Sequence, residues 1–98
     1  MKIAVLGAGM VGRAIALDLV NKYDVTSFDV NKDNLKALKK LNPAIKIRAV
    51  NLSEYKNFTR WLTPFGMAVS AVPGYMGYKT LKAIINAGKN GVDISFFS

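Results

Sequence analysis

The chain has 98 residues, of which 51% are apolar and 20% are charged, and its formal net charge is +8. This composition is typical of one small folded domain and excludes a disordered tail. The absence of cysteine and histidine excludes a disulfide scaffold and a cysteine nucleophile and removes the commonest metal ligands, so we expect no metal site.

The first predicted elements are a strand and a helix joined by a glycine-rich turn. Residues 2–6 form a short run of branched apolar side chains, which is typical of a buried parallel strand. Residues 11–21 change to a helical period, with apolar residues at intervals of four. Arg13 and Asp18 argue against a signal peptide, and no apolar run approaches the ~18–20 residues that span a membrane. We therefore expect a cytoplasmic protein that does not enter a membrane.

A second strand and helix follow. Residues 24–30 return to the composition of a strand, and Asn31 is a predicted N-cap for a helix over residues 32–41 that Pro43 ends. The lysines of this helix lie off its leucine stripe, so we interpret them as a solvated face and not as a phosphate clamp. The remaining lysines are scattered, which favours a solvated surface over nucleic-acid binding.

The second half of the chain continues the alternation of strands and helices. We predict a strand near a sheet edge over residues 45–50 and then a short helix that Ser53 caps and that ends at residue 62. A buried strand over residues 67–72 follows, and then a helix over residues 75–87 with Gly88 at C′. The last predicted element is a strand over residues 91–95.

This order of elements predicts the fold class. Strands that alternate with helices form a parallel α/β sheet with helices on both faces. We predict a doubly wound, Rossmann-type sheet of five strands in the order 3-2-1-4-5, with residues 1–98 as a single dinucleotide-binding domain. Because the chain stops soon after the fifth predicted strand, we expect it to be the N-terminal piece of a longer protein. A fifth strand left at the sheet edge would allow the piece to form a homodimer.

The turn after the first predicted strand carries the motif G-x-G-x-x-G. Gly7 permits the tight turn, Gly9 allows a pyrophosphate to approach the backbone, and Gly12 lets the helix pack closely on the strand. The N–H groups near Met10 and Val11 would then point at the phosphates, helped by the helix dipole.

An acidic side chain ends the second predicted strand. Asp29 stands where a carboxylate accepts hydrogen bonds from the adenosine ribose hydroxyls and repels a 2′-phosphate. Val30 follows it in place of an arginine, although Lys32 is a nearby cation. The sequence therefore favours NAD over NADP as the cofactor, with Asp29 and Val30 among its ligands.

Two further loops are expected at the same edge of the sheet. Asn51 and Leu52 follow the third predicted strand and would lie near the adenine. Ala71, Val72 and Pro73 follow the fourth and would pass along the cofactor toward the nicotinamide ribose. No residue of the chain is assigned a catalytic role.

These motifs together resemble the N-terminal NAD(P)-binding domain of the saccharopine dehydrogenase family, in particular its lysine 6-dehydrogenase-like branch. The resemblance is carried by residues 7–12, 70–74, 87–89 and 92–95. It implies that the complete protein is an NAD(P)-dependent oxidoreductase of amino-acid metabolism that acts on an amino-acid C–N bond. It also implies a substrate domain after Ser98, through which the small amino-acid substrate would bind, so the 98-residue piece alone would be inactive.

Other functions remain open at this point. Members of the family often carry an aspartate where this chain has Asn51. The alternative is a regulatory NAD-sensing module like the nucleotide-binding domains of potassium uptake systems, which share the pattern from Gly7 to Asp29. Those modules place an acidic segment after the fourth strand, whereas residues 73–78 of this chain are uncharged. A polyanion-binding domain, motivated by the net charge, predicts a steep salt dependence of binding.

Overall fold

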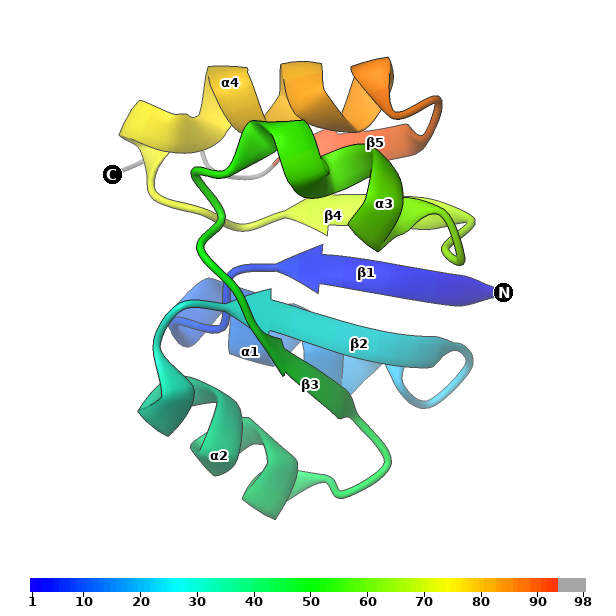
Figure 1. The fold of residues 1–98 in the computed structure, drawn as a ribbon. Coiled ribbons are helices and arrows are strands. Elements are labelled where there is room, and N and C mark those ends of the chain that lie inside the picture. Colours follow the sequence, from blue (N-terminus) through cyan, green and yellow to red (C-terminus); the bar gives the residue numbers. More distant parts are fainter. Residues whose placement is uncertain (94–98) are drawn as a thin grey trace.

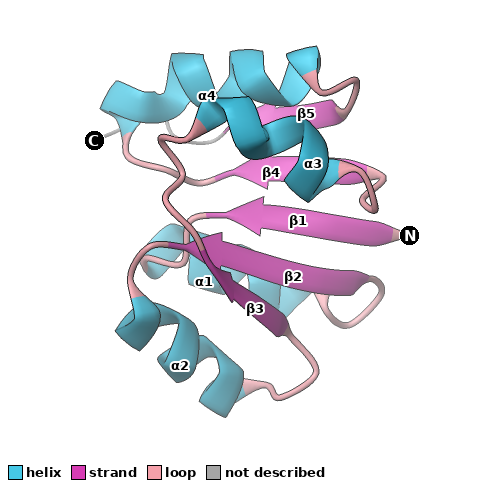
Figure 2. Ribbon diagram, viewed as in Figure 1, coloured by secondary structure: helices cyan, strands magenta, loops and turns pink. Residues whose placement is uncertain are grey.

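A parallel sheet with helices on both faces forms the protein in a computed structural model that describes residues 1–93 (Figures 1 and 2). The strands are β1 (Lys2–Leu6), β2 (Asp24–Asp29), β3 (Lys46–Ala49), β4 (Met67–Ser70) and β5 (Asn90–Asp93). The helices are α1 (Met10–Leu19), α2 (Lys32–Leu41), the 3₁₀ turn η1 (Tyr55–Asn57), α3 (Phe58–Leu62) and α4 (Gly74–Asn86). The order β3-β2-β1-β4-β5, with every pair parallel, confirms the predicted topology. The predicted end of the last strand, residues 94 and 95, lies outside the described residues.

Alternation along the strands divides the apolar side chains between two cores. On β1, Ile3 and Val5 face α1 and α2 and pack in one cluster with Leu38. Leu6 lies in the other cluster, which Trp61 of α3 and other residues of α3 and α4 complete. Because both faces are covered, the central strands β2, β1 and β4 are buried along nearly their whole length, as is typical of parallel sheets.

The strand register brings three loops together at one edge of the sheet. Leu6, near the end of β1, pairs with Phe28 of β2 and with Ser70 of β4. The chain therefore leaves these strands side by side, at the left edge in Figure 1. After β1 and β2 it enters helices on one face, and after β4 it enters a helix on the other face. Such a change of side opens a crevice beyond the carboxyl ends of the strands.

Local signals at the helix ends are confirmed in one case and wrong in another. Asn31 caps α2, because its Oδ1 accepts a hydrogen bond from the Asn34 N–H at 3.0 Å. Ser53 does not cap the next helical segment, as its sequence position had suggested. Its N–H and its hydroxyl both donate to Oδ1 of Asn51, at 3.0 and 2.6 Å. In this Asx turn the Ser53 hydroxyl is directed at the Asn51 side chain. The hydroxyl of an N-cap serine would instead accept a hydrogen bond from a backbone N–H of the helix that follows.

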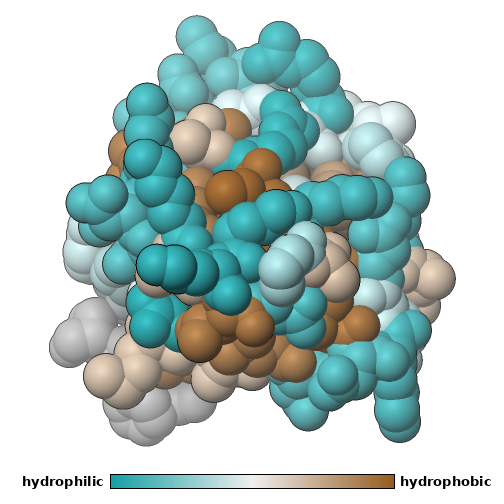
Figure 3. Space-filling view, turned by 90° about the horizontal axis from the view of Figure 1, so that it is seen from below, coloured by the Kyte–Doolittle hydropathy of each residue, from teal (hydrophilic) through white to brown (hydrophobic). Residues whose placement is uncertain are grey.

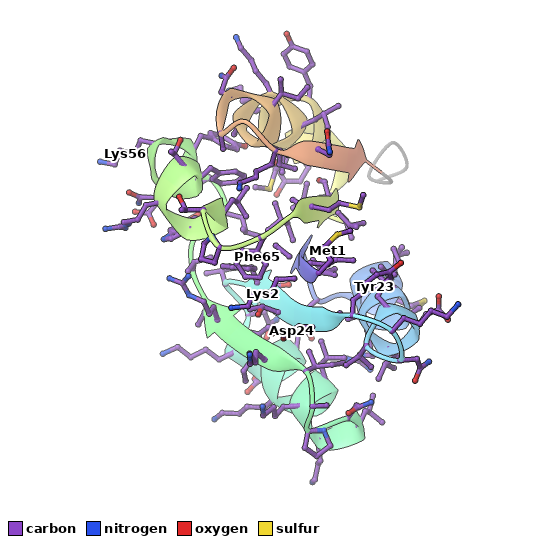
Figure 4. All side chains as sticks on the ribbon, turned by 90° about the vertical axis from the view of Figure 1, so that its right-hand side faces the viewer. Met1, Lys2, Tyr23, Asp24, Lys56 and Phe65 are labelled. Atoms are coloured by element: carbon purple, nitrogen blue, oxygen red, sulfur yellow. The ribbon has the colours of Figure 1, made fainter. Side chains whose placement is uncertain are left out.

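The opposite edge of the sheet, where the strands begin, faces the viewer in Figure 4. Backbone hydrogen bonds hold this edge. Gly66 N–H donates to the Lys2 carbonyl at 2.9 Å, and Asp24 N–H donates to the Met1 carbonyl at 3.2 Å. Phe65 is buried in the same region. These contacts fasten the turns that precede β2 and β4 and leave the carboxyl edge as the open side of the crevice.

The edge strand β3 and helix α2 present a largely hydrophilic face, broken by apolar residues (Figure 3). Lys46 and Arg48 are exposed on β3, and Lys46 forms an ion pair with Asp24 at 3.2 Å. The Arg48 guanidinium lies 5.3 Å from the centre of the Phe28 ring. Charges of this kind discourage an edge strand from pairing with another chain. Among the helices of residues 1–93, none has the length and apolar character needed to cross a membrane.

Candidate functional site

Three glycines stand at the turn from β1 into α1, and a side chain would meet different surroundings at each. Gly7 has φ 108°, and a Cβ there would lie 2.7 Å from the carbonyl oxygen of Ala71. A Cβ on Gly12 would overlap the carbonyl oxygen of Gly7. A Cβ on Gly9 would meet nothing within 4 Å. Gly7 and Gly12 are therefore needed for packing, whereas Gly9 borders open space.

The amino end of α1 adds unpaired backbone donors to that space. Gly9 is the N-cap, makes no side-chain capping hydrogen bond, and accepts the Arg13 N–H at its carbonyl at 2.8 Å. The first turn contains no acidic residue, and Met10 and Val11 are exposed. The first N–H groups of a helix lack partners within it and carry the positive end of its dipole. The position is therefore suited to an anion.

The carboxylate of Asp29 lies between this turn and the start of α2. Its Oδ2 accepts a hydrogen bond from the Ala8 N–H at 2.6 Å, and its Oδ1 accepts one from the Asn31 N–H at 2.9 Å. A carboxylate has about four acceptor positions. Asp29 can therefore hold both backbone segments and still accept further hydrogen bonds from hydroxyl groups.

A cavity of about 470 Å³ joins these features and lies along the carboxyl edge. Most of the residues predicted from the sequence line it, namely Gly7, Gly9, Met10, Val11, Asp29, Val30, Leu52, Ala71, Val72 and Pro73. Leu52 and Val72 are nearly fully buried and contribute apolar wall. The cavity thus combines backbone donors, one carboxylate and an apolar surface, as small-molecule sites usually do.

Two of the predicted residues lie elsewhere. Gly12 packs beneath the turn, against the Gly7 carbonyl, and is not part of the cavity wall. Asn51 also lies outside that wall, and its side-chain oxygen is engaged by Ser53 in the turn after β3. In the described structure both residues shape the site from outside it.

Four further residues line the cavity that were not predicted as ligands. They are Asn31, Asn34, Tyr75 and Met76. Asn31 had been recognised only as a helix cap, and the others as members of helices. A signal was nevertheless present, because the first turn of any helix that follows a parallel strand begins at the carboxyl edge of the sheet.

The charge of the cavity is simple. Of the described residues that line it, Asp29 alone is charged, and neither lysine nor arginine is among them. Lys32, the cation nearest in sequence, instead lines a smaller hollow of about 180 Å³ that Ile47 of β3 also borders. The cavity therefore combines the amino end of α1, which favours an anion, with the fixed negative charge of Asp29 beside the glycine turn.

Comparisons with known proteins identify a family model and solved structures that this chain resembles. Residues 3–97 match the family model described as the saccharopine dehydrogenase NADP-binding domain. Among solved structures, saccharopine dehydrogenase (L-Glu forming) from Saccharomyces cerevisiae is similar over 99% of this chain and 22% of its own, with 21% identity and a TM-score of 0.81. The chain thus spans about a fifth of that protein's length.

A second similar structure shows how widely the fold is shared. A short-chain dehydrogenase/reductase from Veillonella parvula, solved in complex with NADP, matches over 94% of this chain and 46% of its own, with 12% identity and a TM-score of 0.70. At such identities the structural likeness establishes the fold alone. A search of curated proteins found no match.

Proposed function

Because the chain belongs to the family of saccharopine dehydrogenase NADP-binding domains, we propose that its cavity binds a nicotinamide adenine dinucleotide and prefers NAD to NADP. The observation that carries this proposal is the open space at Gly9, next to uncapped N–H groups of α1 and to the Asp29 carboxylate. A dinucleotide needs all three features, since it carries a pyrophosphate and ribose hydroxyls.

Each part of the cofactor has a matching part of the cavity. Gly9 and the N–H groups of the first turn of α1 would hold the pyrophosphate. Asp29 would accept hydrogen bonds from the adenosine ribose hydroxyls through its remaining lone pairs. The apolar side chains of Val30 and Leu52 would border the adenine, and Val72 would lie along the cofactor toward the nicotinamide ribose. When bound, the cofactor supplies hydride chemistry, and the protein supplies position and electrostatics.

The preference for NAD follows from the charge of the cavity. NADP differs by a phosphate on the ribose hydroxyl that Asp29 would contact, and like charges at that distance repel. The described cavity wall holds no cation to offset this repulsion, and Lys32 borders a different hollow. The description of the family names NADP. A preference for NAD would therefore distinguish this chain from that description.

The role of the domain is that of a cofactor-binding unit of an oxidoreductase acting on an amino-acid C–N bond. The family membership supports this role. The titratable side chains of the described cavity wall are Asp29 and Tyr75. We propose that the substrate binds through a separate substrate domain.

Calorimetric titration of the 98-residue chain with NADH and with NADPH, each at two salt concentrations, tests the proposal. We expect NADH to bind more tightly than NADPH, and the difference to shrink at high salt because repulsion by Asp29 is screened. Tighter binding of NADPH would contradict the preference for NAD. Binding of neither dinucleotide would contradict the proposed cofactor role of the cavity.

A further inference from the structure

We infer that Asp29 is a positioning residue for the glycine turn as well as a ligand for the ribose, so that cofactor preference and the order of the turn depend on the same two oxygens. The role of Asp29 as a ribose ligand rests on the proposed dinucleotide site. The role of Asp29 in positioning the glycine turn concerns the free protein and can be tested without a cofactor.

The hydrogen bonds of Asp29 connect segments that are distant in sequence. Ala8 is fully buried in the middle of the glycine turn, and its N–H donates to Oδ2 over a separation of 21 residues. The Asn31 N–H, at the start of α2, donates to Oδ1. Each oxygen therefore holds one wall of the cavity, and the carboxylate fixes the distance between the turn and α2.

The neighbouring backbone strengthens this arrangement. Gly7 N–H donates to the Phe28 carbonyl at 2.7 Å, and Val50 N–H donates to the Asp29 carbonyl at 2.9 Å. The main chain at residue 29 is thus fixed between the glycine turn and the segment after β3. Its side chain has little freedom to leave the Ala8 N–H without leaving that donor buried and unsatisfied, which is costly.

A neutral residue at position 29 cannot reproduce the arrangement. Asparagine has one side-chain oxygen, and its amide group is a donor. In either orientation of the amide, one of the two backbone N–H groups would face another donor. Removing the charge to admit a 2′-phosphate would therefore also release the turn that binds the pyrophosphate, and both dinucleotides would bind more weakly.

The first experiment measures amide hydrogen exchange in the free 98-residue chain by NMR, in the native protein and in Asp29→Asn. The ratio of the Ala8 exchange rate to that of Val5, a buried residue of β1, separates local release from global destabilisation. We expect Asp29→Asn to raise this ratio about tenfold or more, which is the loss of a hydrogen bond to a charged group. Asp33→Asn is the matched control, since Asp33 is an exposed carboxylate in the first turn of α2 that does not line the cavity. An unchanged ratio in Asp29→Asn would overturn the positioning role.

The second experiment titrates the same variants with NADH and NADPH. Weaker binding of both to Asp29→Asn, with Asp33→Asn close to the native protein, supports the inference. Unchanged or tighter NADPH binding by Asp29→Asn would overturn the link between preference and order. If the native chain binds neither dinucleotide, the proposed function fails, while the exchange ratio still decides whether Asp29 positions the turn.

A third measurement needs no variant and covers the case in which Asp29→Asn does not fold. In the native chain labelled with ¹⁵N and ¹³C, a hydrogen bond transmits a scalar coupling from the Ala8 nitrogen to the Asp29 side-chain carboxyl carbon. We expect this coupling to be detectable without any cofactor. Its absence, where backbone couplings within β1 and β2 are seen in the same spectrum, would overturn the inference.

Discussion

Gly9 offers a direct test of the site, because its substitution should separate binding from folding. The residue has φ −71° and ψ −165°, which any amino acid can adopt, and a Cβ there meets nothing within 4 Å. Alanine is less favourable than glycine at an N-cap, by roughly 0.5–1 kcal/mol. It also reduces the entropy of the unfolded chain, which is worth about 0.4–1 kcal/mol in the opposite direction. We therefore expect Gly9→Ala to change the free energy of unfolding by less than about 1 kcal/mol.

The effect on binding should be much larger. The open space beside Gly9 is where the pyrophosphate would approach the backbone, and a methyl group there would hold it away from the N–H groups of α1. We expect Gly9→Ala to weaken NADH binding at least about tenfold, which corresponds to ~1.4 kcal/mol or more. Thermal unfolding measures the first quantity and calorimetric titration the second. For a domain of this size, 1 kcal/mol corresponds to a shift in Tm of about 4–8 °C.

Gly12→Ala is the matched control for the same change in the same turn. Its Cβ would overlap the Gly7 carbonyl, which is backbone and cannot move aside cheaply. We expect a loss of about 1–3 kcal/mol or more in the free energy of unfolding, in contrast to Gly9→Ala. Binding of NADH to Gly9→Ala at the native affinity would refute the placement of the pyrophosphate. A large loss of stability in Gly9→Ala would refute the description of Gly9 as a position without packing.

Three predictions concern stability. Asn31→Ala removes the acceptor for the Asn34 N–H and should lower the free energy of unfolding, measured by urea denaturation, by about 1 kcal/mol. An unchanged denaturation midpoint would mean that the cap contributes nothing in solution. Phe28→Ala should cost about 3–5 kcal/mol, because the ring is fully buried, and a loss below that range would show that the site collapses around the missing ring. The exposed ion pair of Lys46 with Asp24 should show a coupling below about 1 kcal/mol in a double-mutant cycle, and a larger value would contradict its description as a solvent-screened pair.

The scaffold could be predicted from the sequence because its signals are local and repeat along the chain. The residues of β1 and the start of α2 are where the pattern placed them, since a run of branched residues and an asparagine cap each act within a few positions. The strand order followed from the lengths of the crossovers and the handedness of parallel connections. The end of β4 was less accurate. The predicted strand ran to residue 72, whereas β4 ends at Ser70. Ala71 N–H still donates to the Leu6 carbonyl of β1 at 2.8 Å, and Ala71 and Val72 border the cavity.

The site could be predicted where it depends on main-chain geometry and less well where it depends on side chains from other segments. The glycine turn carries its own constraint, and Gly7 does have positive φ. Asn51 was expected beside the adenine from its place after the third strand. Its side chain instead closes a turn with Ser53, and nothing in the strand pattern distinguishes these two uses of an asparagine. Tyr75 and Asn34 were assigned to helices, and their place in the cavity wall depends on how those helices begin.

Asp29 shows that the type of a residue and its place in a motif are not enough to define its role. An aspartate at the end of the second strand is read as a ribose ligand and as a barrier to NADP, and both readings treat the side chain as free. In the structure its oxygens already accept from Ala8 and Asn31. The contact with Ala8 requires β1 and β2 to pair in register, since Leu6 lies opposite Phe28 only in that pairing. In the proposed site the same carboxylate would hold the turn and contact the cofactor, so we expect that exchange of Asp29 for a neutral residue will not by itself produce tight NADP binding unless another group accepts the Ala8 N–H.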